Sequence, residues 1–261
     1  MAALSGFDRR RINGPEESFP PIFDIKAQLK PRQRLGRKTT DIRPIFLQPG
    51  LISQANGSAY IETERTKLAC AVYGPRQSKN TSYSEKGRLN VEVKFTPFSC
   101  TMRKTPIRDA EDRSLAVAIH QALLSSIRLE LLPKSAIDIF IMIIEADGIE
   151  GCVASGAIAA STALAVAGIE MLGLVTSCSA CIVGNEIWLD PTEEEAQNSE
   201  GTLVLSCMPA IGSITSIWQN GKMGTEQALS CLGSCEDRCI EIHSVVAQAL
   251  LEHTQNDKAE T

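Results

Sequence analysis

The chain has 261 residues, of which 43% are hydrophobic and 22% charged, and its formal net charge is −5. This is the composition of an ordinary globular protein, and the length suffices for one large domain or two small ones with a substantial core. The charge is unevenly distributed, since residues 1–113 contain 21 Lys and Arg against 12 Asp and Glu, and residues 114–261 contain 5 against 19. A basic first half attracts phosphate, whereas an acidic second half argues against a protein that coats nucleic acid on every side. Scattered solvated charge would give the same counts.

Residues 1–40 are rich in Arg, Lys and Pro and have no sustained apolar period. They predict a basic N-terminal extension that is partly disordered when alone. Arg9, Arg10 and Arg11 form a compact positive cluster within it. This cluster can hold phosphate, dock on an acidic protein surface, or serve only as a solubilising tail.

Strands and turns are predicted to alternate from Asp41 to residue 95. The predicted strands are Ile42–Gln48, Ala59–Thr63, Leu68–Tyr73 and Arg88–Phe95. Gly57 and Ser58 are predicted to form the turn before the second strand, and Gly74–Lys86 an exposed polar loop. The fourth strand alternates apolar and polar residues, which predicts one buried face.

Two helices and a buried strand are predicted next. Apolar residues recur at helical spacing within residues 115–127, and Asp109 or Asp112 can cap this helix. Ile137–Ile144 is an almost uninterrupted apolar run, which is typical of a strand covered on both faces. The Ala-rich segment Cys152–Ala167 predicts a helix whose small residues allow close approach of neighbouring elements.

Residues 151–184 contain only one charged residue, Glu170, and therefore have to be considered as a membrane segment. They consist mostly of Ala, Gly, Ser, Thr and Cys, and glycines interrupt them. A buried helix followed by a strand is favoured over a membrane span.

Four strands and a long helix are predicted for the remaining chain. The strands are Leu174–Val183, Glu186–Leu189, Thr202–Cys207 and Ile211–Trp218, with hairpin turns at Gly184-Asn185 and Asn220-Gly221. The helix is predicted from Thr225 to Glu252, with an apolar stripe that runs from Leu229 to Ala249. This order of strands and helices indicates an α+β or mixed α/β domain.

Several ordered motifs carry a resemblance to a known family. They are GLISQANGSAYIETERTKLACAVYGP at residues 50–75, GRLN at 87–90, AVAGIEM at 165–171, LDPTEEE at 189–195 and MP at 208–209. In order and spacing they resemble the ribonuclease PH (RNase PH) family over residues 41–254. Within that family, DRRRINGPEES at residues 8–18 is most similar to ring subunits of the eukaryotic RNA exosome, of the messenger-RNA transport regulator type.

The resemblance implies an α+β fold with duplicated βαβα halves packed face to face. The chain would then divide into a basic extension at residues 1–40, an RNase PH-like domain at 41–254 and a C-terminal tail at 255–261. Family members form six-membered rings around a channel for single-stranded RNA. In active members, inorganic phosphate attacks the last phosphodiester at the RNA 3′ end and releases a nucleoside diphosphate.

Phosphorolysis brings an anion to an anionic backbone, so it needs arginines and usually a metal ion held by carboxylates. By the resemblance, the two aspartates of active members correspond here to Ala196 and Thr202. The phosphate-binding arginine has its nearest match at Cys152 or Val153. We therefore expect no catalytic residues, no metal and no cofactor.

A displaced set of acids is the alternative to that expectation. The remaining candidates for an active phosphorolytic site are Asp190, Glu193, Glu194, Glu195 and Glu200. Misplacement of such groups by about 1 Å costs orders of magnitude in rate, and a solvated acidic loop after Asp190-Pro191 is the simpler interpretation.

Six basic residues are candidates for contact with RNA. By the resemblance, Arg113 faces RNA at the start of the first helix, and two residues flank the polar loop that borders the ring channel. The full set is Arg76, Arg88, Arg103, Lys104, Arg108 and Arg113. Such contacts would be made to phosphate and would be salt-sensitive. Ordinary surface charge, or ion pairs to neighbouring subunits, is the alternative explanation.

The resemblance also implies partners and a location. The partners would be other RNase PH-like ring subunits, RNA-binding cap subunits with OB and KH domains, a hydrolytic nuclease reached through the ring, and single-stranded RNA, with no membrane. The expected location is the nucleus, nucleolus and cytoplasm.

Nine cysteines make an odd count, and no signal-peptide-like stretch precedes them, so we expect a reducing compartment and free thiols. Cys178 and Cys181 form a C-x-x-C pair, but residues three apart in a strand face opposite sides. Cys231, Cys235 and Cys239 fall on the apolar stripe of the last helix. Buried reduced thiols are favoured over a zinc site.

Overall fold

The computed structural model describes residues 34, 36–77, 84–100, 103–104, 110–184 and 186–260. Residues 1–35 and 36–261 separate into two units, and every element named below belongs to the second. The strands are β1 (Phe46–Pro49), β2 (Gly57–Thr63), β3 (Thr66–Gln77), β4 (Arg88–Phe95), β5 (Ser135–Glu145), β6 (Thr176–Val183), β7 (Glu186–Leu189), β8 (Gly201–Met208) and β9 (Ser213–Gly221). The helices are α1 (Ala110–Leu124), the short 3-10 helix η2 (Leu129–Leu131), α2 (Ile149–Val166), α3 (Glu193–Gln197) and α4 (Thr225–Glu260).

The first half of the chain forms a five-stranded sheet in the order β1-β2-β3-β5-β4. Strands β4 and β5 are parallel and are joined by α1, as a crossover connection requires, and the other pairs are antiparallel. With α2 after β5, this half contains the expected βαβα order. Strand β1 begins at Phe46 rather than at Ile42, because Pro44 has no N–H to donate and Arg43 is engaged in ion pairs.

The second half forms a four-stranded antiparallel sheet in the order β7-β6-β8-β9. Its element order is ββαββα, in which the five-residue helix α3 connects β7 to β8. These two strands run parallel to each other on either side of β6, and the hairpin strand β9 precedes α4. The turn predicted at Asn220-Gly221 is wrong, since both residues lie at the end of β9. The chain reverses between β8 and β9 at residues 209–212 instead.

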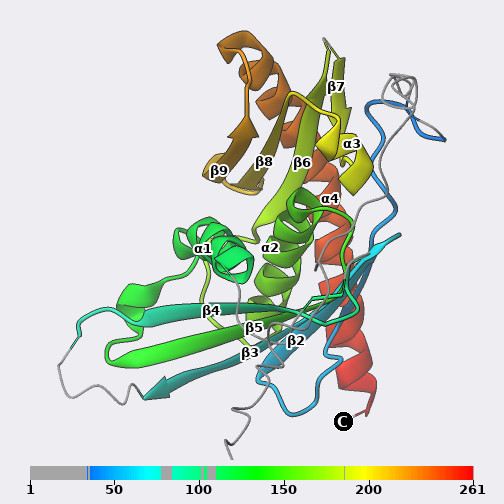
Figure 1. Ribbon diagram of the computed structural model, residues 1–261. Helices are drawn as coiled ribbons and strands as arrows, with labels where there is room; N and C mark the ends of the chain where they lie inside the picture. Colours follow the sequence, from blue (N-terminus) through cyan, green and yellow to red (C-terminus); the bar gives the residue numbers. More distant parts are fainter. Residues whose placement is uncertain are drawn as a thin grey trace, which may run out of the picture. The chain divides into compact units, whose positions relative to one another are not determined.

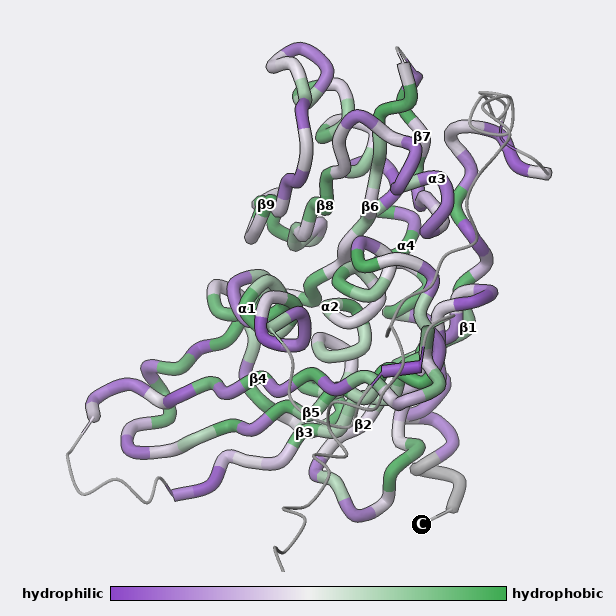
Figure 2. The backbone as a smooth tube through the Cα atoms, viewed as in Figure 1, coloured by the Kyte–Doolittle hydropathy of each residue, from purple (hydrophilic) through white to green (hydrophobic). Residues whose placement is uncertain are grey.

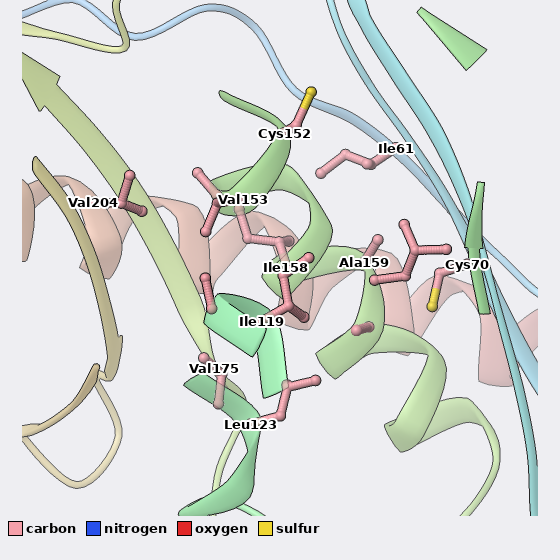
Figure 3. Packing of buried hydrophobic residues seen from close by; sticks show 14 of the residues in the cluster. Ile61, Cys70, Ile119, Leu123, Cys152, Val153, Ile158, Ala159, Val175 and Val204 are labelled. Atoms are coloured by element: carbon pink, nitrogen blue, oxygen red, sulfur yellow. The ribbon is translucent and has the colours of Figure 1, made fainter. Parts of the chain in front are cut away.

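Helix α2 lies between the two sheets and packs against β2 and β3 on one side and β6 and β8 on the other (Figure 1). Figure 3 shows its side chains meeting Ile61 and Cys70 of the first sheet and Val204 of the second. Gly57 belongs to β2 and not to the predicted turn, since it pairs with Val72 of β3. A Cβ at this position would meet the Ala163 carbonyl oxygen at 2.2 Å, so the glycine lets β2 lie close to α2. The small residues of α2 therefore bring both sheets close to the helix.

Among the described residues, α2 is the one helix that is long and apolar enough to cross a membrane. Its 18-residue window is 83% buried inside the protein. The prediction of a buried helix followed by a strand is confirmed, since β6 begins at Thr176.

Helix α4 covers the other face of the second sheet, against β6 and β8. Its buried stripe consists of Cys231, Cys235, Cys239, Ile242 and Val246. Leu229 was predicted as part of this stripe but is 64% exposed, because the stripe passes through Cys231 instead. The helix also continues to Glu260, beyond its predicted end at Glu252 and into the segment predicted as a tail.

Strand β5 differs from its prediction in how its two faces are covered. Its isoleucines at 137, 139, 141 and 143 are buried, but Phe140 and Met142 between them are 44% and 51% exposed. The side chains of this apolar run are therefore buried on one face of the sheet and exposed on the other. The helix that follows β4 starts at Ala110 with Asp112 in its first turn, so Asp112 is not the cap, and Asp109 lies outside the described residues.

Candidate functional site

A buried group of charges connects the ends of the two sheets. Arg43 precedes β1, Asp147 follows β5 and Asp190 follows β7. The Arg43 side chain is 1% exposed, and its Nε and Nη2 donate to Asp190 Oδ2 and Oδ1 at 2.7 and 2.5 Å. Its Nη1 donates to Asp147 Oδ2 at 2.7 Å. These three residues, the Arg43 cluster, form short charge-assisted bonds that join the first sheet to the second.

The electrostatics of the Arg43 cluster favour the charged forms. Burial opposes the charge on Arg43, but the hydrogen bond and charge of Asp190, together with Asp147, outweigh burial and raise the pKa of Arg43. Burial would likewise raise the pKa of Asp190, yet hydrogen bonds and charge from Arg43, with a contribution from Arg37, lower the pKa of that carboxyl. Arg43 and Asp190 therefore form an ion pair at neutral pH, in which the carboxylate has a structural role.

The segment before Arg43 adds a second layer to this cluster. Arg37 Nη1 lies 3.4 Å from Asp190 Oδ2, and Nη2 lies 3.7 Å from Glu195 Oε2. The backbone N–H of Leu189 donates to the Thr39 carbonyl at 2.8 Å. Residues within the predicted N-terminal extension thus pack on the end of β7.

The acidic run after Asp190 is a short helix and not the solvated loop that was predicted. Thr192 is its N-cap: its Oγ1 accepts from the Glu195 N–H at 3.4 Å, and Glu195 Oε2 accepts from the Thr192 N–H at 3.0 Å. This reciprocal capping box, and three acids in the first turn, stabilise the helix N-terminus. In Figure 2 the segment that carries α3 is hydrophilic.

The five candidate acids of a displaced site have different environments. Asp190 is held by Arg43, Glu195 by the cap of α3, and the Glu193 N–H donates to Asp147 Oδ1 at 3.1 Å. Glu194 and Glu200 are exposed. Within the described ranges, no three His, Cys, Asp or Glu side chains gather in a way that could hold a metal ion. The geometry assigns the best-placed of these acids to ion pairing and helix capping.

The two positions that the resemblance matches to aspartates of active family members lie on different elements. Ala196 is in α3, where its N–H donates to the Thr192 carbonyl at 2.8 Å. Thr202 is on β8, and its Oγ1 donates to Glu150 Oε1 at 2.8 Å with both side chains buried. The neutral hydroxyl of Thr202 therefore pairs with the carboxylate of Glu150. An aspartate at position 202 would instead place a second carboxylate next to Glu150.

The start of α2 is the region where the phosphate-binding arginine was sought. Gly148 is its N-cap with a φ of 91°, and Glu150 lies buried in the first turn. Cys152 and Val153 are 1% and 2% exposed. Burial raises the pKa of Cys152 to about 12, so this thiol is neutral. The positive end of the helix thus has a carboxylate beside it and no arginine at the matching positions, which is unfavourable for an anion.

Two of the six basic candidates lie at one end of the first sheet. Arg76 on β3 and Arg88 on β4 both pair in register with Ala136 of β5, so they flank the same position of the strand between them. Both are exposed, and the Arg76 guanidinium lies 4.9 Å from the centroid of the Tyr73 ring.

The other basic candidates lie elsewhere. Lys104 is near the far end of β4, where its Nζ lies 3.7 Å from the Phe95 ring centroid and 2.6 Å from Glu111 Oε2. Arg103 is exposed. Arg113 lines an open surface pocket with three carboxylates, those of Glu92, Asp112 and Asp138. Arg108 lies outside the described residues. Arg88 therefore lies at the start of β4 and Lys104 near its end, so the described candidates fall at different ends of this strand.

The cysteines are all free thiols, and those of β6 and α4 are buried. Hydrogen bonding to Cys235, followed by burial, raises the pKa of Cys178. A thiol from the sheet thus meets one from the helix in an apolar layer, which confirms the expectation of reduced cysteines in the core.

Sequence reasoning missed Arg43 and Asp147 as site residues. The signal was a charged residue inside an apolar stretch, Asp41-Ile42-Arg43-Pro44-Ile45. Such a charge is almost never fully buried unless it is paired. Its partners lie 104 and 147 residues away, which only the folded chain reveals.

Comparison with known proteins gives consistent matches. Residues 41–170 match the 3′ exoribonuclease (RNase PH) family, domain 1, and residues 173–233 match domain 2. The exosome complex component mtr3 of Schizosaccharomyces pombe is 35% identical over 251 residues, covering 94% of this chain and 96% of that protein. Human exosome complex component MTR3 is 32% identical over 262 residues, covering 94% of each. The exosome component Rrp41 of Pyrococcus horikoshii is 38% identical over 199 residues, covering 76% and 79%.

Solved structures show the same fold. An Archaeoglobus fulgidus exosome with RNA bound to the active site superposes with a TM-score of 0.74 at 18% identity, covering 84% of this chain and 95% of that one. Rice Rrp46 gives a TM-score of 0.70 at 20% identity, covering 82% and 96%. The family matches and the identity over nearly the whole chain establish that this protein belongs to the 3′ exoribonuclease, or RNase PH, family.

Proposed function

We propose that the chain is a non-catalytic structural subunit of the hexameric ring of an RNA exosome. It would support 3′-to-5′ RNA processing and degradation by helping to form the channel that guides single-stranded RNA to a partner nuclease. The observation that carries this proposal is the pairing of Thr202 with Glu150 beside the neutral Cys152. By the resemblance, Thr202 stands where active members have an aspartate and Cys152 is a nearest match to their phosphate-binding arginine, so groups that phosphorolysis needs would be missing.

The proposed partners follow from the exosome components that the chain resembles. They are the other RNase PH-like ring subunits, RNA-binding cap subunits with OB and KH domains, and a hydrolytic nuclease reached through the ring. The proposed location is the nucleus, nucleolus and cytoplasm, where such an assembly would process ribosomal RNA and degrade messenger RNA.

The alternative is an active phosphate-dependent 3′-to-5′ exoribonuclease. It is favoured by the similarity to an exosome structure described as having RNA bound to its active site. The test is to assemble the ring with this chain, leave out any hydrolytic nuclease, and incubate it with oligo(A), magnesium and phosphate. Failure of the chain to enter the ring would contradict the structural role, and phosphate-dependent release of ADP that depends on this chain would contradict the non-catalytic role.

A double substitution sharpens this test. Ala196→Asp with Thr202→Asp is expected to give no phosphorolysis, because no arginine stands at Cys152 or Val153. The Thr202→Asp change also places a second carboxylate against Glu150 in a buried site, which destabilises the fold. Circular dichroism separates misfolding from inactivity. Phosphate-dependent turnover by the folded double variant would show that the phosphate site lies elsewhere.

Arg76 and Arg88 are the proposed RNA contacts that the sheet brings closest together. Arg76→Gln with Arg88→Gln should weaken crosslinking of single-stranded RNA to this subunit in the ring. The slope of log K against log salt should decrease by about 1 for each phosphate that is no longer neutralised. Arg238→Gln on α4, an arginine paired with Glu241, is the matched control. Equal crosslinking for both variants would assign Arg76 and Arg88 to structure or to subunit contacts.

A further inference from the structure

A group of buried cysteines lies between helix α4 and the second sheet. Cys231, Cys235 and Cys239 are spaced four residues apart on the buried stripe of α4, and each is 0% exposed. Residues at this spacing share one face of a helix. Cys178 on β6 and Cys207 on β8 are each 3% exposed. Helix α4 packs against both strands, so thiols of the helix and of the sheet share one apolar layer (Figure 1).

Thr176 identifies the face of the sheet that these thiols share with the helix. It lies on β6 and pairs in register with Cys207 on β8, so the two side chains project from the same face. Cys178, two residues further along β6, projects from this face as well. Thr176 Oγ1 lies 4.0 Å from Cys207 Sγ and donates to the Cys239 carbonyl at 3.2 Å. One hydroxyl therefore contacts both residues, which places the turn of α4 that carries Cys239 next to Cys207.

The Cys207 and Cys239 thiols hydrogen-bond to each other. This bond is the largest influence on Cys207, and with a smaller contribution from Thr176 it outweighs burial and lowers the pKa of Cys207. The same bond, followed by burial, raises the pKa of Cys239. The proton is therefore held by Cys239, and negative charge is favoured on Cys207. A thiolate is the form of cysteine that attacks an oxidant, and here it has a second thiol beside it.

Other buried thiols of the sheets keep their protons. Cys178 hydrogen-bonds with Cys235, and this bond, followed by burial, raises the pKa of Cys178. Burial also raises the pKa of Cys70, a thiol with 0% exposure that packs between the first sheet and α2 (Figure 3). Reactivity toward oxidants follows thiolate character. Among Cys70, Cys178 and Cys207, the thiol best suited to react first is therefore Cys207.

We propose that Cys207 and Cys239 form an oxidation site, at which hydrogen peroxide converts the two thiols into a disulfide that joins α4 to β8. The Cys207 thiolate first attacks one peroxide oxygen, which breaks the O–O bond, forms Cys207 sulfenic acid and releases hydroxide. The Cys239 sulfur then attacks the sulfenic acid sulfur, which forms the S–S bond and breaks the S–O bond. The two thiol protons go to the two hydroxides that leave, so one peroxide is reduced to two molecules of water. This site is independent of the proposed ring function, because it concerns one helix and the sheet on which it packs.

The burial of both sulfurs determines which oxidant can react and how fast. Glutathione disulfide is too large to reach side chains that are 3% and 0% exposed, whereas hydrogen peroxide is a small molecule. Peroxide reaches Cys207 during local opening of α4 from the sheet, which makes the reaction slow. Because Cys239 is already in contact, it captures the sulfenic acid before a second oxidation to sulfinic acid. The cysteine layer is therefore reduced at rest and becomes linked under oxidation.

The test treats the folded, full-length chain with hydrogen peroxide. The remaining thiols are then alkylated in denaturant, and peptides are mapped by mass spectrometry without reduction. We expect loss of the free Cys207 and Cys239 thiols as one linked pair of peptides, while Cys70 is still alkylated. Cys239→Ala should leave Cys207 as a sulfenic acid that dimedone traps. Cys70→Ala is the matched control, since it also removes a thiol with 0% exposure, and it should leave the link intact.

Urea unfolding of wild type gives a second measurement, which does not depend on any variant. The linked chain should unfold at a higher urea concentration than the reduced chain, because a disulfide restricts the unfolded state. Dithiothreitol should reverse this shift, whereas it does not reverse methionine oxidation. Oxidation of Cys70 while Cys207 and Cys239 stay reduced would overturn the proposal. A link that forms only in urea, or that joins Cys207 to another cysteine, would overturn it as well.

Discussion

The two sheets of this protein are built from similarly apolar strands but are covered differently. Strands β6 and β8 lie between α2 and α4, and every residue of β8 is buried. Strand β5 lies on α2 with one face only, and its alternate side chains reach solvent. Strands β6 and β8 are therefore covered on both faces by the chain itself, whereas the edge strand β9 exposes Ile214 and Ile217. The first sheet has an apolar face that suits a partner, which is the behaviour expected of a subunit.

The two sheets are joined by the Arg43 cluster, whose carboxylates follow β5 and β7. In a family named for exoribonuclease activity, this part of the molecule carries buried ion pairs, a helix cap and a neutral thiol. The charge that remains has a structural use, since it fixes how the ends of the sheets meet.

Removing the arginine should give the largest loss of stability. Arg43→Met leaves two carboxylates near the protein interior without their cation, and the free energy of unfolding should fall by about 3–5 kcal/mol. Urea denaturation followed by circular dichroism measures this change. Lys94→Met, which removes an exposed ion pair of the first sheet, is the control and should cost less than about 1 kcal/mol. Equal effects of the two substitutions would contradict the role of Arg43 as the link between the sheets.

Side-chain truncations to alanine measure how differently the strands of the two sheets are buried. Leu205→Ala on β8 removes a side chain with 0% exposure and should cost about 2–5 kcal/mol in the isolated chain. Met142→Ala on β5 truncates a half-exposed side chain and should cost less than about 1 kcal/mol. The same urea titration gives both values. A cost for Met142→Ala as large as that for Leu205→Ala would mean that the face of the first sheet that carries Met142 is already covered in the isolated chain.

Acid should weaken the link between the sheets. The pKa of Asp190 is lowered from 3.8 in the folded protein, so the unfolded state binds the proton more readily. The stabilisation is therefore complete above the unfolded pKa and is lost as pH falls through the lower folded pKa. Each unit of pKa difference contributes about 1.4 kcal/mol.

Urea unfolding of wild type and Asp190→Asn between pH 6 and pH 3 isolates this contribution, with the pH range chosen to span the carboxylate pKa of about 3.9. The difference in stability between the two proteins should shrink as pH falls. A difference that grows toward acid pH would show that the Asp190 pKa is raised and not lowered.

Much of the fold could be predicted because periodicity reports which side of an element is covered. The strand at 88–95 and the long last helix followed from the spacing of apolar residues, and the helix between the sheets followed from its Ala-rich composition. The exposure of Phe140 and Met142 was not predicted. An apolar residue in the sequence does not indicate whether this chain or a partner buries its side chain. Gly57 was read as a turn because its close approach to α2 depends on tertiary packing.

The candidate site was also predicted only in part. The motifs around Ala196 and Thr202 indicated that the usual charged groups are missing, and residue identity was enough for that prediction. The contacts found at these positions were not predictable, because the Thr202–Glu150 bond joins residues 52 positions apart and the partners of Arg43 lie 104 and 147 positions away. The acidic run was mistaken for a loop although Thr192 and Glu195 have the spacing of a capping box.

Methionine oxidation tests the central claim most directly, because each sheet carries one informative methionine. Met142 is 51% exposed on β5, and Met208 is 5% exposed on β8. In the isolated chain, peroxide should oxidise Met142 quickly and Met208 slowly, as read by mass spectrometry of peptides. In the assembled ring, the oxidation of Met142 should slow to the rate of Met208, whose own rate should not change. Fast oxidation of Met142 in a fully assembled ring would contradict the account, because the first sheet would then have no second cover.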